Sequence, residues 1–275
     1  MSLHMTGAGA LEDPICTYPG SRLPVRAPCA RLEGRYLAFL GGSETFGRFV
    51  ETPFPALLDR RLGQTCVNLG SINAGLDAVL GDAGAMRIAA GAALTVVQLP
   101  DAQNLTNGFY RVHPRRNDRF LAACAPLIAL YPEVDFTEFH FTRHLLTALH
   151  RHCPDRFATL RAELQRLWVS RMHRLLRALG GRALLLWLHD GGDRPRSDAP
   201  LGGEPLLVSS TMVGRVSRQA RGLVEVPVTA AGQLEGETRK MAFGPLQRPT
   251  AEHMLGPAMH ARIADRLGDA IAALQ

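Results

Sequence analysis

A serine, Ser43, stands directly after a strand-like run of the chain. Residues 36–47 read Tyr-Leu-Ala-Phe-Leu-Gly-Gly-Ser-Glu-Thr-Phe-Gly. The run Leu37–Leu40 is apolar without alternation, which is typical of a strand covered on both faces, and the glycine pair after it permits a sharp turn. Open α/β sheets bind ligands at the carboxyl ends of their strands. The position predicts a nucleophilic hydroxyl, although a serine here can also do no more than cap the next helix.

A second group of chemically capable residues is a run of arginines. From His113 to Arg119 the chain reads His-Pro-Arg-Arg-Asn-Asp-Arg, with Arg115 and Arg116 in its centre. Arginine forks recognise carboxylate, phosphate or sulfate, so this pair is a candidate for binding an anionic small-molecule substrate. The alternative is an exposed helix start.

Two histidines have the spacing of a metal-binding pair. His140 and His144 are four residues apart, which would place both rings on one face of a helix. No glutamate follows the first of them, as a zinc protease motif requires. We therefore predict no metal site, and nothing else in the sequence requires a cofactor.

The elements that must position these residues alternate between short apolar runs and helical patterns. This alternation predicts parallel strands joined by helices through right-handed crossovers. We expect a three-layer α/β/α sandwich with a five-stranded parallel sheet in the flavodoxin-like order 2-1-3-4-5, the first strand being central. The expected strands are 36–41, 65–69, 93–99, 183–188 and 223–228, and the expected helices are 53–63, 75–90, 155–179, 210–220 with Ser210 as its cap, and 257–274.

Two segments fall outside this alternation. Residues 1–34 hold glycines and prolines with little periodicity, so we expect an irregular N-terminal arm on a domain of residues 35–275. Residues 104–180 form a mainly helical insertion between the third and fourth strands, after an expected loop over 104–116. Because the insertion leaves from the carboxyl end of a strand, we expect 104–150 to cover the pocket.

Composition excludes several classes of protein. The 275 residues are 46% hydrophobic, which is ordinary for a globular protein, and there is no repeat or low-complexity tract. The formal charge of +6 is carried almost wholly by arginine, since Lys240 is the only lysine. These arginines are interspersed with acidic residues and no recognition motif accompanies them, so we expect no nucleic-acid partner. The oligomeric state is not determined by the sequence.

The cysteines and the absence of long apolar runs indicate a compartment. Five cysteines are widely spaced without a Cys-x-x-Cys pair, so we expect reduced thiols that lie mostly in the core. No run approaches the roughly 18 apolar residues of a membrane span, and no signal peptide pattern opens the chain. We expect a cytoplasmic protein without a membrane partner.

Four blocks of the sequence together resemble the SGNH, or GDSL-like, hydrolase superfamily, over about Tyr36 to Gln275. Residues 41–47, Gly-Gly-Ser-Glu-Thr-Phe-Gly, are similar to its Gly-Asp-Ser-x-Thr-x-Gly block, with Gly42 in place of the aspartate and Ser43 as nucleophile. Residues 68–75, Asn-Leu-Gly-Ser-Ile-Asn-Ala-Gly, resemble its second block. The resemblance implies that Gly70 donates its N–H to the oxyanion hole, where a side chain would obstruct the substrate; a plain glycine-rich turn is the alternative.

The other two blocks depart further from the superfamily. In the third, Asn104 matches the oxyanion asparagine, but the glycine before it is absent and Gln103 and Asn107 are competing donors. In the fourth, the resemblance implies that His253 is the base, because imidazole can take the serine proton and return it to the leaving group. Thr250 stands where the orienting aspartate is expected, and the neighbouring Glu252 is badly placed to replace it.

The resemblance implies a serine esterase or acyl-transfer enzyme that acts on an acyl ester. Ser43 and His253 would be catalytic, and Ser43 N–H, Gly70 and Asn104 would bind the oxyanion. His253 as a surface histidine and Asn104 as a loop-forming residue are the alternatives for these two, and His260 is expected to pack in the core. Two other functions stay open. One is a catalytically degenerate binding protein, and the other is a sulfo- or phosphoryl-group transferase that uses the Gly41–Thr45 loop with Arg115 and Arg116.

Overall fold

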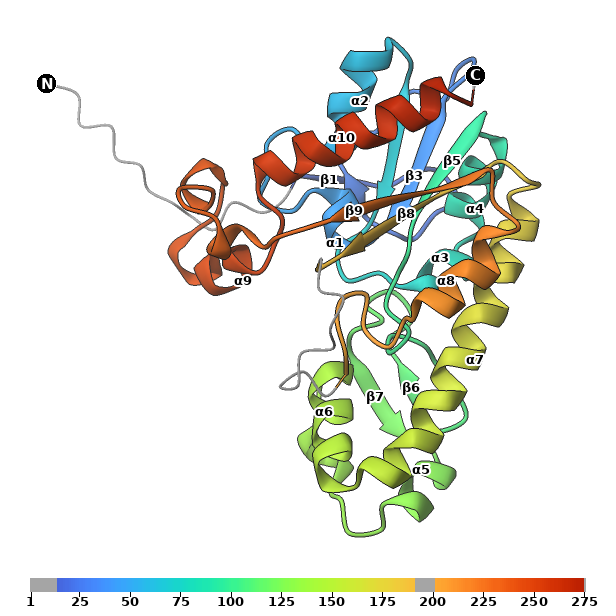
Figure 1. The fold of residues 1–275 in the computed structure, drawn as a ribbon, viewed down its shortest axis with the longest axis vertical. Coiled ribbons are helices and arrows are strands. Elements are labelled where there is room, and N and C mark those ends of the chain that lie inside the picture. The colour runs from blue at the N-terminus through green and yellow to red at the C-terminus, as the bar shows by residue number, and fades with distance from the viewer. Residues whose placement is uncertain (1–13, 191–200, 275) are drawn as a thin grey trace, which may run out of the picture.

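The computed structural model describes residues 14–190 and 201–274, and its centre is a five-stranded parallel sheet (Figure 1). The strand order is β4-β3-β5-β8-β9, which is the predicted order 2-1-3-4-5 with the first strand of the sheet in an inner position. In register, Phe39 lies opposite both Asn68 and Val96. The strands are β3 (Leu37–Gly41), β4 (Cys66–Gly70), β5 (Leu94–Gln98), β8 (Ala183–His189) and β9 (Gly222–Pro227).

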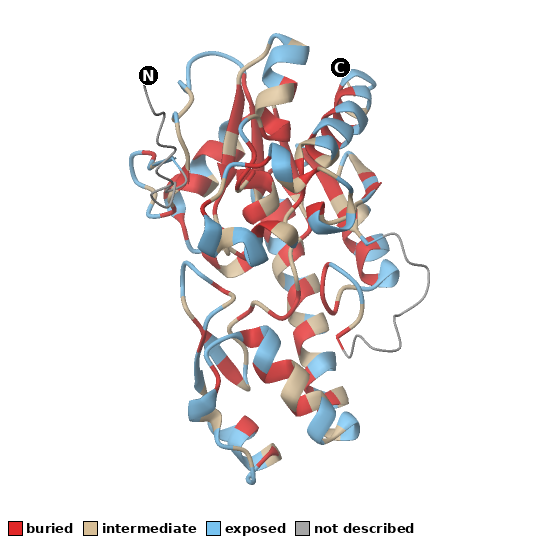
Figure 2. Cartoon of the chain, turned by 90° about the vertical axis from the view of Figure 1, so that its left-hand side faces the viewer, coloured by how far each residue is buried: buried red, intermediate tan, exposed pale blue. Residues whose placement is uncertain are grey.

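Helices cover both faces of this sheet and make it the middle of three layers. On one face, the buried side chains of α2 (Phe54–Leu62) and α10 (Pro257–Ala272) pack against Leu37 and Phe39. The other face is covered by α3 (Leu76–Leu80), α4 (Ala83–Gly91), α7 (Pro154–Ala178) and α8 (Ser210–Ser217). The strands β3 and β8 lie buried between the layers (Figure 2), as their unbroken apolar runs predict.

The insertion leaves from the carboxyl end of β5 and lies beyond that edge of the sheet (Figure 1). A hairpin that the sequence analysis missed begins in the expected opening loop and ends in the segment expected to be helical, and each of its strands is only three or four residues long. The strands pair antiparallel, and the chain then continues through short helices into α7. These elements are β6 (Tyr110–Val112), β7 (Phe120–Ala123), α5 (Ala125–Leu130), the 3-10 turn η1 (Phe136–Glu138) and α6 (Thr142–His152).

A second excursion, residues 229–255, follows the carboxyl end of β9 and stands to one side of the sheet (Figure 1). It consists of short helical turns, and we call it the C-terminal lobe. Its Ala231, Met241 and Ala251 pack on Phe49, which follows α1 (Ser43–Phe46). Glu237 anchors it to α10, because its carboxylate accepts hydrogen bonds from Lys240 and from the N–H of Ala258. The turns are η2 (Ala231–Gln233), η3 (Thr238–Lys240), η4 (Pro245–Gln247) and α9 (Arg248–Glu252).

The N-terminal arm is more ordered than predicted over its described part, from residue 14 onward. Its strands β1 (Ile15–Cys16) and β2 (Val25–Arg26) pair antiparallel. The expectation that all five cysteines are reduced is wrong for two of them, because Cys16 in β1 and Cys29 after β2 form a disulfide. Their separation of 13 residues resembles no sequence motif, and only the turn of the arm brings the two sulfurs together.

Three smaller details complete the comparison with the expected elements. The expected helix 75–90 is interrupted after Leu80, and Asp82 begins α4 by accepting a hydrogen bond from the N–H of Ala85. The cap of α8 is Ser209 rather than Ser210, since its hydroxyl accepts from Met212 N. Among the described residues, no helix combines the length and apolarity that crossing a membrane would need.

Candidate functional site

Ser43 occupies the place that the sequence predicts, at the carboxyl end of β3. It begins the four-residue helix α1, and its side chain is buried. The turn closes because Phe46 N donates to Gly42 O and Gly47 N donates to Ser43 O, and Gly47 ends the helix with a left-handed backbone (φ 76°). The glycines thus fix the direction in which Ser43 leaves the sheet.

The hydroxyl of Ser43 is held by an asparagine that the sequence analysis did not select. Asn73 N donates to Ser43 Oγ at 3.2 Å, and Ser43 Oγ donates to Asn73 Oδ1 at 3.3 Å. Asn73 has a left-handed backbone with φ of 58°, a conformation that asparagine tolerates better than most residues. A serine hydroxyl held from two sides has a defined direction before any substrate arrives.

Asn117, a residue of the insertion, holds the turn that contains Asn73. Asn117 is completely buried, and its side-chain oxygen accepts from Gly75 N at 2.9 Å and from Ala78 N at 3.0 Å. Its backbone N–H donates to Asn73 O, and its amide donates to His113 O. The insertion is therefore bound directly to the turn that holds Ser43.

Gly70 lies at the end of β4 beside α1, but its N–H already has a partner. It donates to Asn68 Oδ1 at 2.8 Å, while Asn68 Nδ2 donates to Thr45 O. A Cβ on Gly70 would lie 2.3 Å from Phe46 N. The glycine is thus needed for the close approach of α1 to β4. This is the structural role that the sequence analysis names as the alternative to an oxyanion donor.

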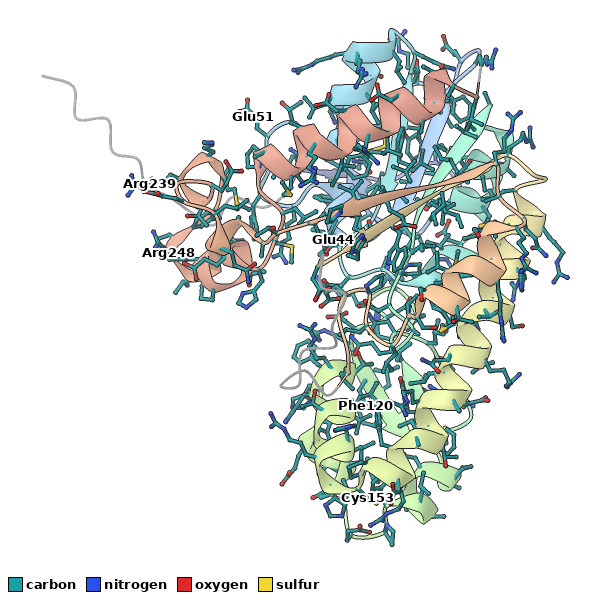
Figure 3. All side chains as sticks on the ribbon, in the orientation of Figure 1. Glu44, Glu51, Phe120, Cys153, Arg239 and Arg248 are labelled. Carbon is teal, nitrogen blue, oxygen red and sulfur yellow. A yellow bond between two sulfur atoms is a disulfide. The ribbon has the colours of Figure 1, made fainter. Side chains whose placement is uncertain are left out.

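Polar side chains gather beside Ser43 at the carboxyl edge. Thr45 Oγ1 lies 2.5 Å from Gln98 Oε1, and Gln98 Nε2 donates to Glu44 at 2.9 Å. In Figure 3, Glu44 lies between the end of the sheet and the insertion. Burial, followed by the charge of Glu204, raises the pKa of Asp101. The site therefore has a carboxyl group that holds its proton more strongly than usual.

Asn104 is occupied in fastening the insertion. Its side-chain oxygen accepts from Thr142 Oγ1 at 2.7 Å, and its Nδ2 lies 3.4 Å from Asp101 Oδ2. Arg143, next to Thr142, forms an ion pair with Glu204. The competing donor Gln103 is buried, and Asn107 caps its own turn by accepting from Phe109 N and Tyr110 N.

The two histidines of the last sequence block have different environments. His253 is exposed at the end of α9 in the C-terminal lobe, where its Nδ1 lies 2.8 Å from Pro249 O. His260 packs in the core as predicted: its Nδ1 accepts from Phe54 N at 3.1 Å, and its ring stacks on Phe54. Burial lowers the pKa of His260 to about 4, so this ring is neutral.

Arg115 and Arg116 are exposed in the connection between β6 and β7. Their backbone N–H groups both donate to His113 Nδ1. Asn117, the next residue, is the one that binds the Asn73 turn. Within the described ranges, no three His, Cys, Asp or Glu side chains are grouped to hold a metal ion.

The protein is thus a three-layer α/β/α sandwich in which polar residues gather around a serine at the carboxyl end of the sheet. The chain belongs to the family described as a domain of unknown function, DUF6473, whose model matches residues 1–275. A search of curated proteins found no match. Among solved structures, the lipase Lip_vut3 from a goat rumen metagenome is similar with a TM-score of 0.39 and 11% identity, over 85% of this chain and 96% of that chain.

Proposed function

We propose that the protein is an SGNH-type serine hydrolase or acyltransferase that cleaves an acyl ester. The observation that carries this proposal is the orientation of Ser43, whose hydroxyl is held by Asn73 at the carboxyl end of an inner strand. A preset direction for the nucleophile lowers the entropy lost in reaching the acyl carbon. The polar side chains around Ser43 are suited to a reaction whose transition state carries a developing charge.

The proposed reaction has two halves. Ser43 Oγ attacks the acyl carbon while His253 takes its proton, and the bond to the leaving alkoxide breaks as the histidine returns that proton. Water or an alcohol then attacks the acyl carbon and gives its proton to His253. The bond from that carbon to Ser43 Oγ breaks, Oγ takes the proton back from His253, and an acid or a new ester leaves. The oxyanion would be bound by the N–H of Ser43 and the amide of Asn104, and by the N–H of Gly70 once Asn68 releases it.

The proposed base requires movement of the C-terminal lobe or of its histidine. His253 Nδ1 is paired with Pro249 O, and Ser43 is paired with Asn73. The lobe touches the segment after α1 through Phe49 and Ala242, since Ala242 N donates to Phe49 O at 2.8 Å. It thus adjoins the nucleophile's helix, and a shift of the lobe is the motion that would bring His253 to the serine.

The test is covalent labelling with a fluorophosphonate, followed by hydrolysis of p-nitrophenyl acetate. Wild type should be labelled and Ser43→Ala should not, while Ser210→Ala, an exposed serine on α8, should match wild type. His253→Ala should slow both reactions, with the exposed His140→Ala as its control. Absence of labelling in wild type between pH 6 and 9, with no turnover above Ser43→Ala, would refute the proposal.

The pairing of His253 with Pro249 O, and not with Ser43, favours one alternative, a binding protein that has kept the pocket but not the chemistry. Its ligand would be a small molecule, anionic if Arg115 and Arg116 contact it. An unlabelled Ser43 together with ligand-induced protection of residues 113–118 from hydrogen exchange would support this function over the hydrolase.

A further inference from the structure

A small apolar cavity lies at the carboxyl edge of the sheet, next to the turns that carry Ser43. It encloses about 20 Å³ and lies between the ends of β3 and β5 and the helices α3 and α7. Its walls include Val79 from α3, Val97 from β5 and Leu175 from α7, all of which are buried. The cavity is therefore a built part of the core and not a surface irregularity.

Two residues that line this cavity are close in the chain to Ser43 or to its partner Asn73. Gly41, two residues before Ser43, belongs to the lining, and so does Ala74. Ala74 directly follows Asn73, whose N–H lies 3.2 Å from Ser43 Oγ. An acyl group bound to Ser43 Oγ could thus turn its alkyl end toward the opening.

The chemistry of the walls selects what can enter. The polar lining residue, Gln98, has its amide engaged by Glu44 and Thr45, so it does not offer a free hydrogen bond to the interior. Apolar groups gain by entering such a space, whereas a polar group would lose its hydration without replacement. The volume has room for roughly one group of the size of a water molecule or a methyl.

We propose that this cavity binds the alkyl end of a short acyl group, of acetyl size, on the ester that Ser43 attacks. The inference rests on the proposed function and names its substrate class. Longer acyl chains are excluded because a space of about 20 Å³ has no room for further methylenes. An extra methylene that does not fit an apolar pocket reduces kcat/KM by about 10- to 200-fold.

The experiment compares p-nitrophenyl acetate, butyrate and octanoate on wild type and on two substitutions of one wall residue. Val79→Ala removes two methyl groups from the wall and Val79→Ile adds one. Val216→Ala, a buried valine of α8 outside the lining, controls for the general effect of trimming a core valine. Fluorophosphonate labelling of Ser43 is measured in parallel, since it reports a reactive serine without an acyl chain.

Wild type should prefer acetate over butyrate by about 10-fold or more in kcat/KM. Val79→Ala should bring this ratio close to one, Val79→Ile should lower acetate turnover, and Val216→Ala should leave the ratio unchanged. If Ser43 is labelled but the protein prefers the longer esters, or if Val79→Ala does not change the ratio, the proposed acyl-binding role of the cavity is wrong and the proposed hydrolase function is retained. Unlabelled Ser43 without turnover of any ester would overturn both.

Discussion

Replacing Asn117 by alanine should destabilise the whole chain and also disturb Ser43. The substitution removes a side chain that is completely buried and makes three hydrogen bonds: to Gly75 N, Ala78 N and His113 O. The two N–H groups would remain buried without a partner, at about 1–3 kcal/mol each. We therefore expect the free energy of unfolding to fall by about 2–6 kcal/mol.

Urea unfolding followed by circular dichroism measures the first effect, and the rate of fluorophosphonate labelling measures the second. Asn107→Ala is the matched control, because Asn107 also makes three hydrogen bonds in the insertion but has none to the Asn73 turn. Both variants should lose stability, and only Asn117→Ala should slow labelling under conditions where it is folded. Asn117→Asp, which keeps both acceptor contacts, should lose less stability.

Two results would refute this reasoning. A stability loss below about 1 kcal/mol for Asn117→Ala would show that the buried N–H groups find other partners. Equal slowing of labelling in Asn107→Ala and Asn117→Ala would show that Ser43 responds to any loosening of the insertion, and not to the specific contact with its turn.

Three further predictions concern other contacts. Because the pKa of His260 is lowered to about 4, the unfolded chain binds one more proton than the folded chain between about pH 6.5 and 4. The free energy of unfolding of wild type, measured by urea midpoints, should therefore fall by about 3 kcal/mol as the pH is lowered over that range. It should fall less in His260→Asn. Gly70→Ala should displace α1 from β4 and abolish labelling of Ser43, whereas Gly63→Ala, at a glycine with open space around it, should cost only stability. Reduction of the Cys16–Cys29 disulfide should lower the melting temperature of wild type, because closing this loop stabilises the protein by about 3 kcal/mol. The reductant should leave the melting temperature of Cys16→Ser unchanged, and a change there would contradict the prediction.

The sheet was predictable because its strands are short, mainly apolar runs separated by helical patterns. Leu37–Gly41 and Ala183–His189 can be buried on both faces only in the middle of a layered fold, and the helices between them require parallel pairing. The hairpin β6–β7 was not predictable, because its short strands are stabilised by neighbours distant in sequence. Phe120 N donates to His140 O, 20 residues further along the chain, so a tertiary contact defines β7.

The candidate site was predictable only where the residue type itself carries the chemistry. Ser43 follows a glycine pair, and that context identified it. Asn73 and Asn117 act through backbone N–H groups and a left-handed turn, which many asparagines make without any functional consequence. The sequence Asn73-Ala-Gly75 was a signal for such a turn, but its contact with Ser43 depends on the fold.

The contacts of Asn117 change how the insertion should be understood. An insertion at the carboxyl edge of a sheet is commonly a cover over an otherwise complete site. Here the turn after β4 is held by Asn117 of the insertion. The helix α3 that follows the turn is held by Arg171 of α7, whose guanidinium forms an ion pair with Asp77 at 2.6 Å and also binds Thr106 O. Since Asn73 in that turn orients Ser43, the insertion supports the proposed nucleophile directly. A chain shortened to the sheet and its helices would therefore lose the orientation of Ser43.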